Sequence, residues 1–474
     1  MESSTHASKV VDGSRRSTIQ YEPGMNLFKR FRKRPLRAVV IGLDGVPHSL
    51  LRRLLDEGRM PNFAALLDRG RLLPMQSVLP TVSSVAWASI VTGCNPGQHN
   101  IYGFIDRVPQ THEMFIPTSQ NLTAKTWVEL FSGLGKRVFS MGVPTTYPPR
   151  AVNGVLISGF LAPGLKRATY PLQLARELEE MGYVIDIDAW QAREDRDKFL
   201  DEVFNALDRR CEVMLDFFSR EPWDLFVAHV MDTDRLHHFL WGHIEDENEA
   251  YTSWFYRFYE RVDEALGELA SRLDEDVLLM ILSDHGFCRL KQEVHLNTWL
   301  RQAGYLQFAS DRPRQLRDLS PSTRCYSLLP GRFYVCVQGR EHNGCVARGG
   351  EYEAVRRDVA AGLLEIQDPE TGDQVVQKVL MREEVYSGAA CEAAPDFVAV
   401  PAEGYDLKGG FEKDVLMERG PVNGTHTFED AMFYVNRRCE ERSDLAVVDV
   451  MPTLLEGIGI EVPEALDGRP LALR

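Results

Sequence analysis

Short apolar runs, rich in β-branched residues, recur along the 474-residue chain and predict its strands. Such runs lie at 38–43, 153–160, 224–230, 276–283, 396–400 and 431–435. Uninterrupted apolar runs of this length are typical of strands that are buried on both faces of a parallel sheet. The sequence therefore predicts a sheet that is covered on both sides.

Stretches with helical periodicity lie between these runs, at 48–57, after Pro61, at 197–219 and at 251–273. Pro61 fits the first turn of a helix, because N–H groups in that turn have no partner within the helix and proline has no N–H. Strands that alternate with helices indicate an α/β fold with a largely parallel central sheet and helices on both faces.

The alternation breaks down from about residue 290 to 415, where Gly, Pro and Arg are frequent. We interpret 290–415 as an inserted cap or subdomain, so that 36–289 and 416–474 together form the main domain. An insertion also agrees with the chain length, which exceeds the usual size of a single domain.

The N-terminal residues 1–35 are polar and rich in Ser and Arg, and they lead into the basic stretch KRFRKRPLR. This composition predicts a disordered, solvated tail. The alternative is a weak contact of residues 28–37 with a membrane of anionic lipid or with an acidic partner, in which Phe28 and Phe31 enter the interface.

The chain is acidic, with 54 Lys and Arg against 69 Asp and Glu and a formal net charge of −15. This balance excludes a protein that coats nucleic acid, because the dominant attraction to phosphate would be missing. The acidic net charge is compatible with a small phosphorylated substrate, because a bound metal ion reverses the local field of an acidic pocket.

The eight cysteines form no CxxC motif and have no regular spacing. We interpret them as reduced thiols rather than a disulfide framework or a cysteine-based zinc site. No apolar run reaches the roughly 18 residues that span a bilayer, and the first 35 residues lack the apolar core of a secretory signal. We therefore expect a cytoplasmic protein.

Three aspartates and three histidines lie next to the ends of the predicted strands. They are Asp44, Asp234, His238, Asp284, His285 and His426. Each has an ordinary structural explanation, such as a helix cap, an i,i+4 side-chain pair or a hydrogen-bonded histidine. Together they are oxygen and nitrogen donors that suit Zn²⁺ and similar ions, at the edge where open α/β sheets bind ligands. Six donors are enough for two three-ligand metal sites.

A candidate nucleophile lies in SVLPTVSSVAWASIVTG, which predicts a strand, Pro80, a cluster of hydroxyls and then a helix. The hydroxyls are Thr81, Ser83 and Ser84. The first turn of a helix favours an anion, because its N–H groups are free and the helix dipole is positive there. A plain helix cap is the alternative, whereas a hydroxyl beside a metal ion would be an activated nucleophile.

Seven segments occur in one order from about residue 37 to 471. They are GLDG, MPNFAALLDRG, LPTVSSVAWASIVTGCNPGQHNIYGF, DTDRLHHF, SDHGF, NGTH and DVMPTLLEGIGIEVPEALDGRPL. In these segments the chain resembles the type I phosphodiesterase/nucleotide pyrophosphatase branch of the alkaline phosphatase superfamily. The resemblance implies an alkaline-phosphatase-like α/β sandwich and two divalent metal ions, with Zn²⁺ expected before Mn²⁺.

The resemblance also implies the roles of individual residues. One ion would be held by Asp44, Asp284 and His285, and the other by Asp234, His238 and His426. Ser83 lies nine residues before Thr92, which is the nucleophile position of that branch, where its oxygen also contacts the metal. The neighbouring His237 competes with His238, but the Asp-x-x-x-His spacing favours His238.

Two departures from the family pattern leave the substrate open. Nucleotide-cleaving members carry Phe-Pro-Asn-His after the nucleophile, whereas this chain has the stretch 84–87, Ser-Val-Ala-Trp. The Asn that contacts the phosphoryl group in such enzymes falls near Phe104. We interpret His99 and His295 as structural, and Arg340 as part of a surface ion pair rather than a ligand of the substrate.

The predicted function is two-metal hydrolysis of a small phosphorylated substrate, a phosphodiester or nucleotide pyrophosphate, through a covalent Ser83-phosphoryl intermediate. The alternatives within this chemistry are a phosphomonoesterase and a phosphomutase. A sulfatase fits less well, because the Cys/Ser-x-Pro-x-Arg signature is missing at the nucleophile. The alternative from another class is a transferase or binding protein that uses the same metal site.

Overall fold

The computed structural model describes residues 37–189, 192 and 195–474, which belong to the compact unit Leu36–Arg474. The predicted tail at 1–35, with Phe28 and Phe31, lies outside the described residues. Within the described part of the chain, no helix is both long and apolar enough to cross a bilayer. All eight cysteines are free thiols.

The centre of the fold is an eight-stranded sheet with the strand order β2-β19-β9-β1-β8-β5-β6-β7. Five adjacent strands, from β9 to β6, run parallel, whereas β19 and β7 pair antiparallel with their neighbours. The bounds are β1 Ala38–Leu43, β2 Arg71–Met75, β5 Val138–Met141, β6 Gly154–Ile157, β7 Thr169–Tyr170, β8 Leu225–Val230, β9 Leu278–Leu282 and β19 Ala431–Val435. The predicted, largely parallel sheet is confirmed.

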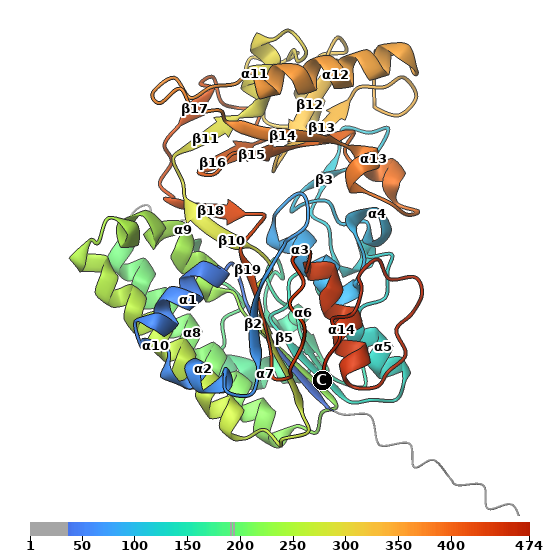
Figure 1. The fold of residues 1–474 in the computed structure, drawn as a ribbon. Coiled ribbons are helices and arrows are strands. Elements are labelled where there is room, and N and C mark those ends of the chain that lie inside the picture. Colours follow the sequence, from blue (N-terminus) through green and yellow to red (C-terminus); the bar gives the residue numbers. More distant parts are fainter. Residues whose placement is uncertain (1–36, 190–191, 193–194) are drawn as a thin grey trace, which may run out of the picture. The chain divides into compact units, whose positions relative to one another are not determined.

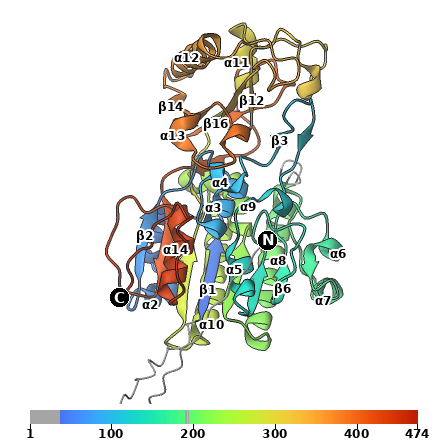
Figure 2. The ribbon, with the colours of Figure 1, turned by 90° about the vertical axis from the view of Figure 1, so that its right-hand side faces the viewer.

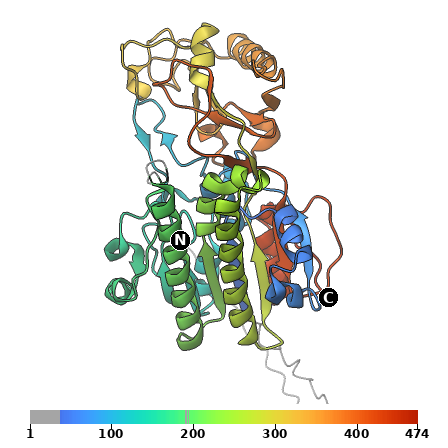
Figure 3. The ribbon, with the colours of Figure 1, turned by 90° about the vertical axis from the view of Figure 1, so that its left-hand side faces the viewer.

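Helices cover both faces of this sheet, because alternate residues of each central strand point to opposite sides. In β1, Val39 and Ile41 belong to one hydrophobic core, whereas Ala38 and Val40 belong to another. The first core is covered by α1 His48–Asp56, α2 Pro61–Leu66, α7 Leu174–Glu180, α8 Arg196–Arg220, α9 Asp232–Glu245 and α10 Glu249–Ser271. The long helices α8 and α10 are prominent in Figure 3. The second is covered by α3 Ser83–Thr92, α5 Trp127–Gly133 and α14 Val450–Gly457.

Two sequence predictions about strands need correction, and one strand was missed. The run 396–400 is a strand, but it belongs to β15 (Phe397–Pro401) in a separate sheet. The strand β5 was not predicted, because its four residues include a serine in place of an uninterrupted apolar run. The strand expected just before Pro80 ends earlier, at Met75, because the backbone at Gln76 and Ser77 then bonds to Leu445 and Phe428.

The segment 290–415 builds most of two further sheets around its own hydrophobic core. One sheet has the order β16-β11-β17 and the other β12-β13-β15-β14. The elements are β11 Gln292–His295, α11 Leu296–Gln302, β12 Cys325–Leu328, β13 Arg332–Val335, α12 Gly350–Leu364, β14 Val376–Met381, α13 Arg382–Val385, β15, β16 Tyr405–Lys408 and β17 Met417–Glu418. Figure 1 shows them in yellow and orange, beyond one end of the central sheet.

Short elements connect this segment to the central sheet. β10 (Gly286–Arg289) pairs antiparallel with β18 (Gly424–Thr427) where the chain leaves and re-enters the main sheet. The remaining short elements are β3 Asp106–Arg107, β4 Met114–Phe115, α4 Pro96–His99 and α6 Leu165–Ala168. Figure 2 shows β1 running toward α3 and α4, with β3 reaching toward the segment 290–415.

Buried polar contacts join the β3–β4 region to the segment 290–415. Arg332 Nη2 donates to the carbonyl of Ile105 at 2.5 Å, and Arg107 pairs with Glu341 at 2.9 Å with both side chains buried. The Tyr102 hydroxyl donates to the carbonyl of Ala390 at 2.7 Å. The loop that follows the hydroxyl-rich helix α3 is therefore held against this segment.

Arg340 was expected in a surface ion pair, and its position needs correction. Its guanidinium binds Asp396 at 2.5 and 2.7 Å, and the Asp396 side chain is completely buried. Tyr352 and Arg382 donate to the same carboxylate. Burial raises the pKa of Asp396, but the bonds and charge of Arg340 outweigh it and hold that pKa below its ordinary value. The ion pair is thus an internal support of the segment 290–415.

Replacing Asp396 should therefore destabilise the protein strongly. Asp396→Asn leaves Arg340 and Arg382 without their carboxylate in the interior, which costs about 3 kcal/mol of unfolding free energy. Urea unfolding of the variant measures the change. The matched control is Glu370→Gln, which removes the exposed partner of Arg419 and should cost less than about 1 kcal/mol. Equal losses in the two variants would contradict the structural role of Asp396.

Candidate active site

Three neighbouring strands bring the predicted site residues together. Asp44 directly follows β1, while Asp284 and His285 follow β9. Asp234 lies in the first turn of α9, just after β8. Because β9, β1 and β8 are adjacent and parallel, their carboxyl ends meet at one edge of the sheet, where such folds bind ligands.

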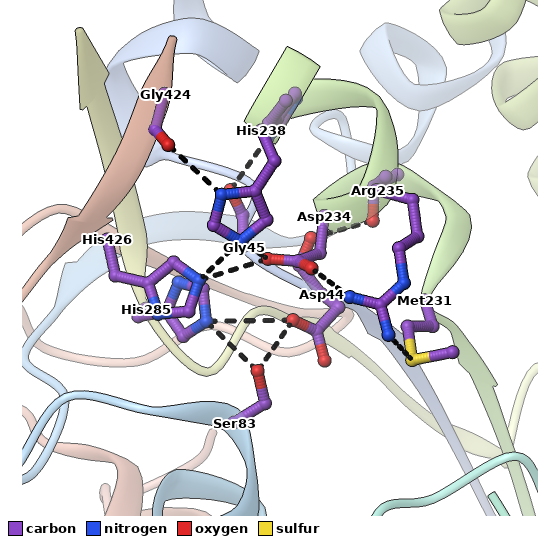
Figure 4. A network of polar contacts seen from close by, with 12 residues as sticks. Asp44, Gly45, Ser83, Met231, Asp234, Arg235, His238, His285, Gly424 and His426 are labelled. Carbon is purple, nitrogen blue, oxygen red and sulfur yellow. Dashed lines mark hydrogen bonds and ion pairs between the residues drawn. The ribbon is translucent and has the colours of Figure 1, made fainter. Parts of the chain in front are cut away.

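The hydroxyl of Ser83 lies within a first group of donors, of which Figure 4 shows Asp44 and His285. Ser83 is the first residue of α3, and its Oγ lies 3.2 Å from Asp44 Oδ1 and 3.3 Å from His285 Nε2. Donor atoms of Asp44, Asp284 and His285 all lie within 4.8 Å of one another. The spacing is suited to one metal ion beside a hydroxyl.

A second group lies beside the first and contains Asp234, His238 and His426. Asp234 Oδ1 is 3.2 Å from His426 Nε2 and 3.4 Å from His238 Nε2, and the two histidine nitrogens are 3.1 Å apart. The rings of His285 and His426 stack with centroids 3.7 Å apart. His285 therefore lies between the groups, and its donor atom is also within 4.8 Å of those of Asp234 and His426.

The histidines are oriented by backbone carbonyls. His238 Nδ1 donates to the carbonyl of Gly424 and His285 Nδ1 to that of Gly286, each at 3.0 Å. A ring nitrogen that donates in this way leaves the lone pair of Nε2 free for a ligand. Burial and the charge of His426 lower the pKa of His285 to about 3, so its ring is neutral at physiological pH.

Each aspartate has one oxygen bound to a protein donor and one that faces the histidines. Asp284 Oδ1 accepts from the Gly45 N–H at 3.1 Å, whereas its Oδ2 is buried, has no hydrogen-bond partner and lies 3.3 Å from His285 Nε2. Asp234 Oδ2 accepts from Arg235 Nη1 at 3.3 Å. Both carboxylates are thus arranged to offer a single oxygen.

Asp44 also has one oxygen that contacts protein donors and one that faces Ser83, and here two side chains contact the first oxygen. Its Oδ2 accepts from Trp87 Nε1 at 2.9 Å and contacts His229 Nε2 at 2.8 Å, so that Oδ1 alone faces Ser83. Burial raises the pKa of Asp44, but the hydrogen bond and charge of His229 outweigh it and lower that pKa below its ordinary value.

The charges of this site are not balanced by the protein alone. Burial and the nearby charge of Asp44 raise the pKa of Asp284 well above its ordinary value. Burial also raises the pKa of Asp234, but the charge of His238 and the bond and charge of His426 bring it well below its ordinary value. The unpartnered buried oxygen of Asp284, 3.3 Å from Nε2 of the neutral His285 ring, fits a divalent cation.

The competing hydroxyls lie differently from Ser83. The Thr81 hydroxyl donates to the carbonyl of Val78 at 3.1 Å. The Ser84 hydroxyl is buried without a hydrogen-bond partner, and no contact joins it to the aspartates or histidines of the two groups. Of the three candidates, Ser83 is the one that both Asp44 and His285 contact.

His237 and His99 have partners outside the two groups of donors. His237 Nδ1 donates to the carbonyl of Gly45, and its Nε2 lies 2.7 Å from the Tyr259 hydroxyl. Burial lowers the pKa of His237 to about 3. His99, the last residue of α4, contacts the hydroxyl of Ser89 on α3 at 2.9 Å. Neither histidine belongs to the two groups.

A third cluster of donor type, Glu293, His295 and Glu418, lies in the sheet of β11 and β17. His295 Nε2 is 3.1 Å from Glu418. Lys413 pairs with Glu418, and Lys408 pairs with Glu293. The carboxylates of this cluster already have cationic partners, in contrast to the free oxygen of Asp284.

Sequence reasoning missed the two residues that bind the second oxygen of Asp44. His229 is the one polar side chain in the run LFVAHV, and it is completely buried. A histidine inside a strand buried on both faces needs partners, and this signal was available in the sequence. Trp87 lies four residues after Ser83 on α3, the spacing that puts two side chains on one helical face.

A cleft of about 620 Å³ opens beside the site. On one side it is lined by Thr81, His238 and His426, and on the other by strands of the segment 290–415. Phe104 also lines it. The cleft has room for a substrate much larger than a phosphate group.

The family described as type I phosphodiesterase/nucleotide pyrophosphatase has a sequence model that matches residues 38–429. No curated protein sequence matches the chain. Phosphonoacetate hydrolase from Sinorhizobium meliloti 1021, solved with phosphonoformate, is 18% identical with a TM-score of 0.62, over 90% of this chain and 95% of the hydrolase. Murine ectonucleotide pyrophosphatase/phosphodiesterase 5 is 14% identical with a TM-score of 0.55, over 92% and 100% of the chains. At these identities the solved structures establish a shared fold.

Asp284 should destabilise the metal-free protein at neutral pH. The pKa of Asp284 in the folded protein lies above its value in the unfolded chain, about 3.9. Between these two pKa values the folded protein binds more protons than the unfolded chain, so the free energy of unfolding falls as pH rises. In the presence of a chelator, Asp284→Asn should be about 2 kcal/mol more stable than the wild type at pH 8.

Urea unfolding from pH 4 to 8 measures this difference, which should shrink toward pH 4, where the wild-type carboxyl is protonated. The comparison with Asp284→Asn isolates Asp284 from the buried histidines, which titrate in both proteins. A wild type that gains stability relative to the variant as pH rises would show that Asp284 already has a partner.

Proposed function

The chain belongs to the type I phosphodiesterase/nucleotide pyrophosphatase family of phosphoric ester hydrolases, and we propose that it acts through a covalent intermediate on Ser83. Membership confirms the resemblance inferred from the sequence motifs. One observation carries the proposal: the Ser83 hydroxyl lies 3.2 Å from Asp44 Oδ1 and 3.3 Å from His285 Nε2, at the start of a helix.

The proposal includes two divalent ions. Asp44, Asp284 and His285 would hold one beside Ser83, and Asp234, His238 and His426 would hold the other. Such ions, when bound, lower the pKa of a nearby hydroxyl or water and neutralise the charge of a transferring phosphoryl group. The Asp and His donors favour Zn²⁺, with Mn²⁺ as the alternative.

The chemistry of the chain's own residues follows from this placement. The Ser83 oxygen attacks phosphorus, a bond between Ser83 and phosphorus forms, and the bond from phosphorus to the leaving ester oxygen breaks. Water then displaces Ser83 and restores its hydroxyl. The first turn of α3 favours negative charge at the Ser83 oxygen in both steps, and the leaving ester oxygen takes up the proton that Ser83 loses.

The size of the cleft supports a substrate with two substituents on phosphorus. A volume of about 620 Å³ is typical of a site for a small organic ligand, so the cleft has room for the leaving group of a diester or pyrophosphate. We therefore favour these substrates over a monoester or a phosphomutase substrate.

A panel of p-nitrophenyl mono- and diesters with added Zn²⁺ or Mn²⁺ distinguishes a diesterase from a monoesterase. Release of phosphate from the monoester alone would favour a phosphomonoesterase.

The proposed partner is thus a small phosphorylated molecule. A cytoplasmic location is also part of the proposal. Its support is chemical, because free cysteine thiols such as the eight of this chain persist in reducing compartments.

Replacing Ser83 tests the covalent step. Ser83→Ala removes the nucleophile and leaves all six metal donors, so turnover should fall by roughly three orders of magnitude or more while two ions per chain are retained. Steady-state kinetics and elemental analysis measure the two quantities. Thr81→Ala and Ser84→Ala are the matched controls, and each should cost about 1 kcal/mol of stability or less.

A Ser83→Ala protein with near wild-type turnover would contradict the covalent mechanism. An inactive Thr81→Ala protein with both ions in place would instead assign the nucleophile to Thr81.

Substrate preference should depend on Lys378, on β14 of the segment 290–415. Lys378 is exposed in the cleft, with its Nζ 5.8 Å from the ring centre of Phe428. Among the described residues it has no carboxylate partner, whereas Lys408 is paired with Asp406 and Glu293. Lys378 is therefore available to a second anionic group of the substrate, which supports the proposal that 290–415 acts as a cap.

The test compares a dinucleotide pyrophosphate, which has two charged phosphates, with bis(p-nitrophenyl) phosphate, which has one. Lys378→Gln should raise KM about tenfold for the pyrophosphate, the value of one charge-assisted hydrogen bond, and leave the diester nearly unchanged. Lys166→Gln, an exposed change outside the cleft, is the control. Equal changes for both substrates would exclude contact of Lys378 with a second anionic group of the substrate.

A further inference from the structure

Asp44 is bound by two side chains that take no part in the steps described so far. Trp87 Nε1 donates to its Oδ2 at 2.9 Å, and His229 Nε2 lies 2.8 Å from the same oxygen. Trp87 and His229 are completely buried, and Asp44 is 1% exposed. One carboxylate oxygen is thus occupied by two protein donors, in a place that water does not reach.

The helix α3 contacts both oxygens of this carboxylate. Ser83, its first residue, contacts Oδ1 at 3.2 Å, and Trp87, one turn later, binds Oδ2. The indole packs directly on the backbone of β1, where a Cβ at Gly42 would lie only 2.2 Å from Trp87 Cη2. The absence of a side chain at Gly42 therefore lets Trp87 reach Asp44.

His229 approaches Asp44 from the neighbouring strand. It lies opposite Gly42 in the parallel register of β1 and β8. Its Nδ1 donates to the carbonyl of Gly142 at 2.8 Å, just after β5, and its ring packs edge-on against Trp87 with centroids 4.6 Å apart. Both ring nitrogens are engaged, so the imidazole has one orientation.

We propose that Trp87 and His229 are positioning residues of the hydrolase, which hold Asp44 so that Oδ1 alone is presented on the side of Ser83. This inference rests on the proposed function, in which Asp44 is a metal ligand. Without the two donors the carboxylate could rotate and offer either oxygen or both. Because Trp87 and Ser83 share one helix, the hydrogen bond from Trp87 to Asp44 also fixes the distance between Ser83, the proposed nucleophile, and Asp44.

The test is the affinity of the metal-free protein for Zn²⁺, measured by competition with a chromogenic chelator. Trp87→Phe keeps an aromatic ring and removes the N–H donor. Partners that orient a metal ligand typically contribute 10–100-fold in affinity or activity, so one of the two ions should bind about 10–100-fold more weakly. At saturating Zn²⁺ the variant should still bind two ions, and kcat should fall more than KM changes.

Trp127→Phe is the matched control, because Trp127 is buried in the same hydrophobic core and does not contact Asp44. It should reproduce the packing effect of losing an indole, with unchanged affinity for both ions. His229 provides a second, independent pair. His229→Gln keeps a donor for Asp44 and should stay closer to the wild type than His229→Leu, which removes it.

The outcomes separate this inference from the proposed function. If the wild type binds two ions and both Trp87→Phe and His229→Leu bind them equally tightly with wild-type kcat, the two residues serve packing alone and the inference is wrong. If the wild type binds neither ion, the proposed function fails and the positioning role fails with it.

Discussion

Three carboxylates buried at one edge of a sheet repel one another, and the arrangement of the site is organised around that repulsion. Asp44, Asp234 and Asp284 are each at most 3% exposed, so solvent cannot screen their charges. The protein compensates two of them, through His229 for Asp44 and through His238 and His426 for Asp234. Asp284 keeps one oxygen without a partner, and this oxygen is where a cation contributes most.

The strand order follows from the same requirement. The aspartates come from the ends of β1, β8 and β9, three strands that lie far apart in sequence and side by side in the sheet. Each strand is buried on both faces, so its register is fixed by packing in two hydrophobic cores. The positions of the carboxylates are thus determined by the core, and little is left to the flexibility of loops.

The positions of residues that follow the apolar strands could be inferred from sequence-local signals. The apolar runs of β1, β8 and β9 identified the strands, so the side chains after them could be placed at one edge. The i,i+4 spacing also chose His238 over His237, and the structure directs only His238 toward His426. These inferences needed the hydrophobic pattern and the geometry of one helix.

Other features depend on contacts between distant segments, which the pattern does not contain. The run 396–400 has the apolar character of a central strand, yet β15 pairs with β13 and β14 in the other sheet. An apolar run shows that a strand is buried but not which sheet buries it. The partners of Arg340 and Asp44 are likewise set by tertiary structure, since Asp396 and His229 are far from them in sequence.

The shared use of α3 limits how the site can vary. Ser83 and Trp87 contact the two oxygens of the Asp44 carboxylate, so a shift of the helix moves the proposed nucleophile and the orientation of the proposed metal ligand together. Their separation is one helical turn, which backbone hydrogen bonds hold constant. One side of the cleft, by contrast, is lined by β14, β15 and β16, which share no helix or strand with these contacts. Side chains of the segment 290–415 can therefore change without moving Ser83 relative to Asp44, and this separation would allow the proposed catalytic arrangement to be combined with different pockets.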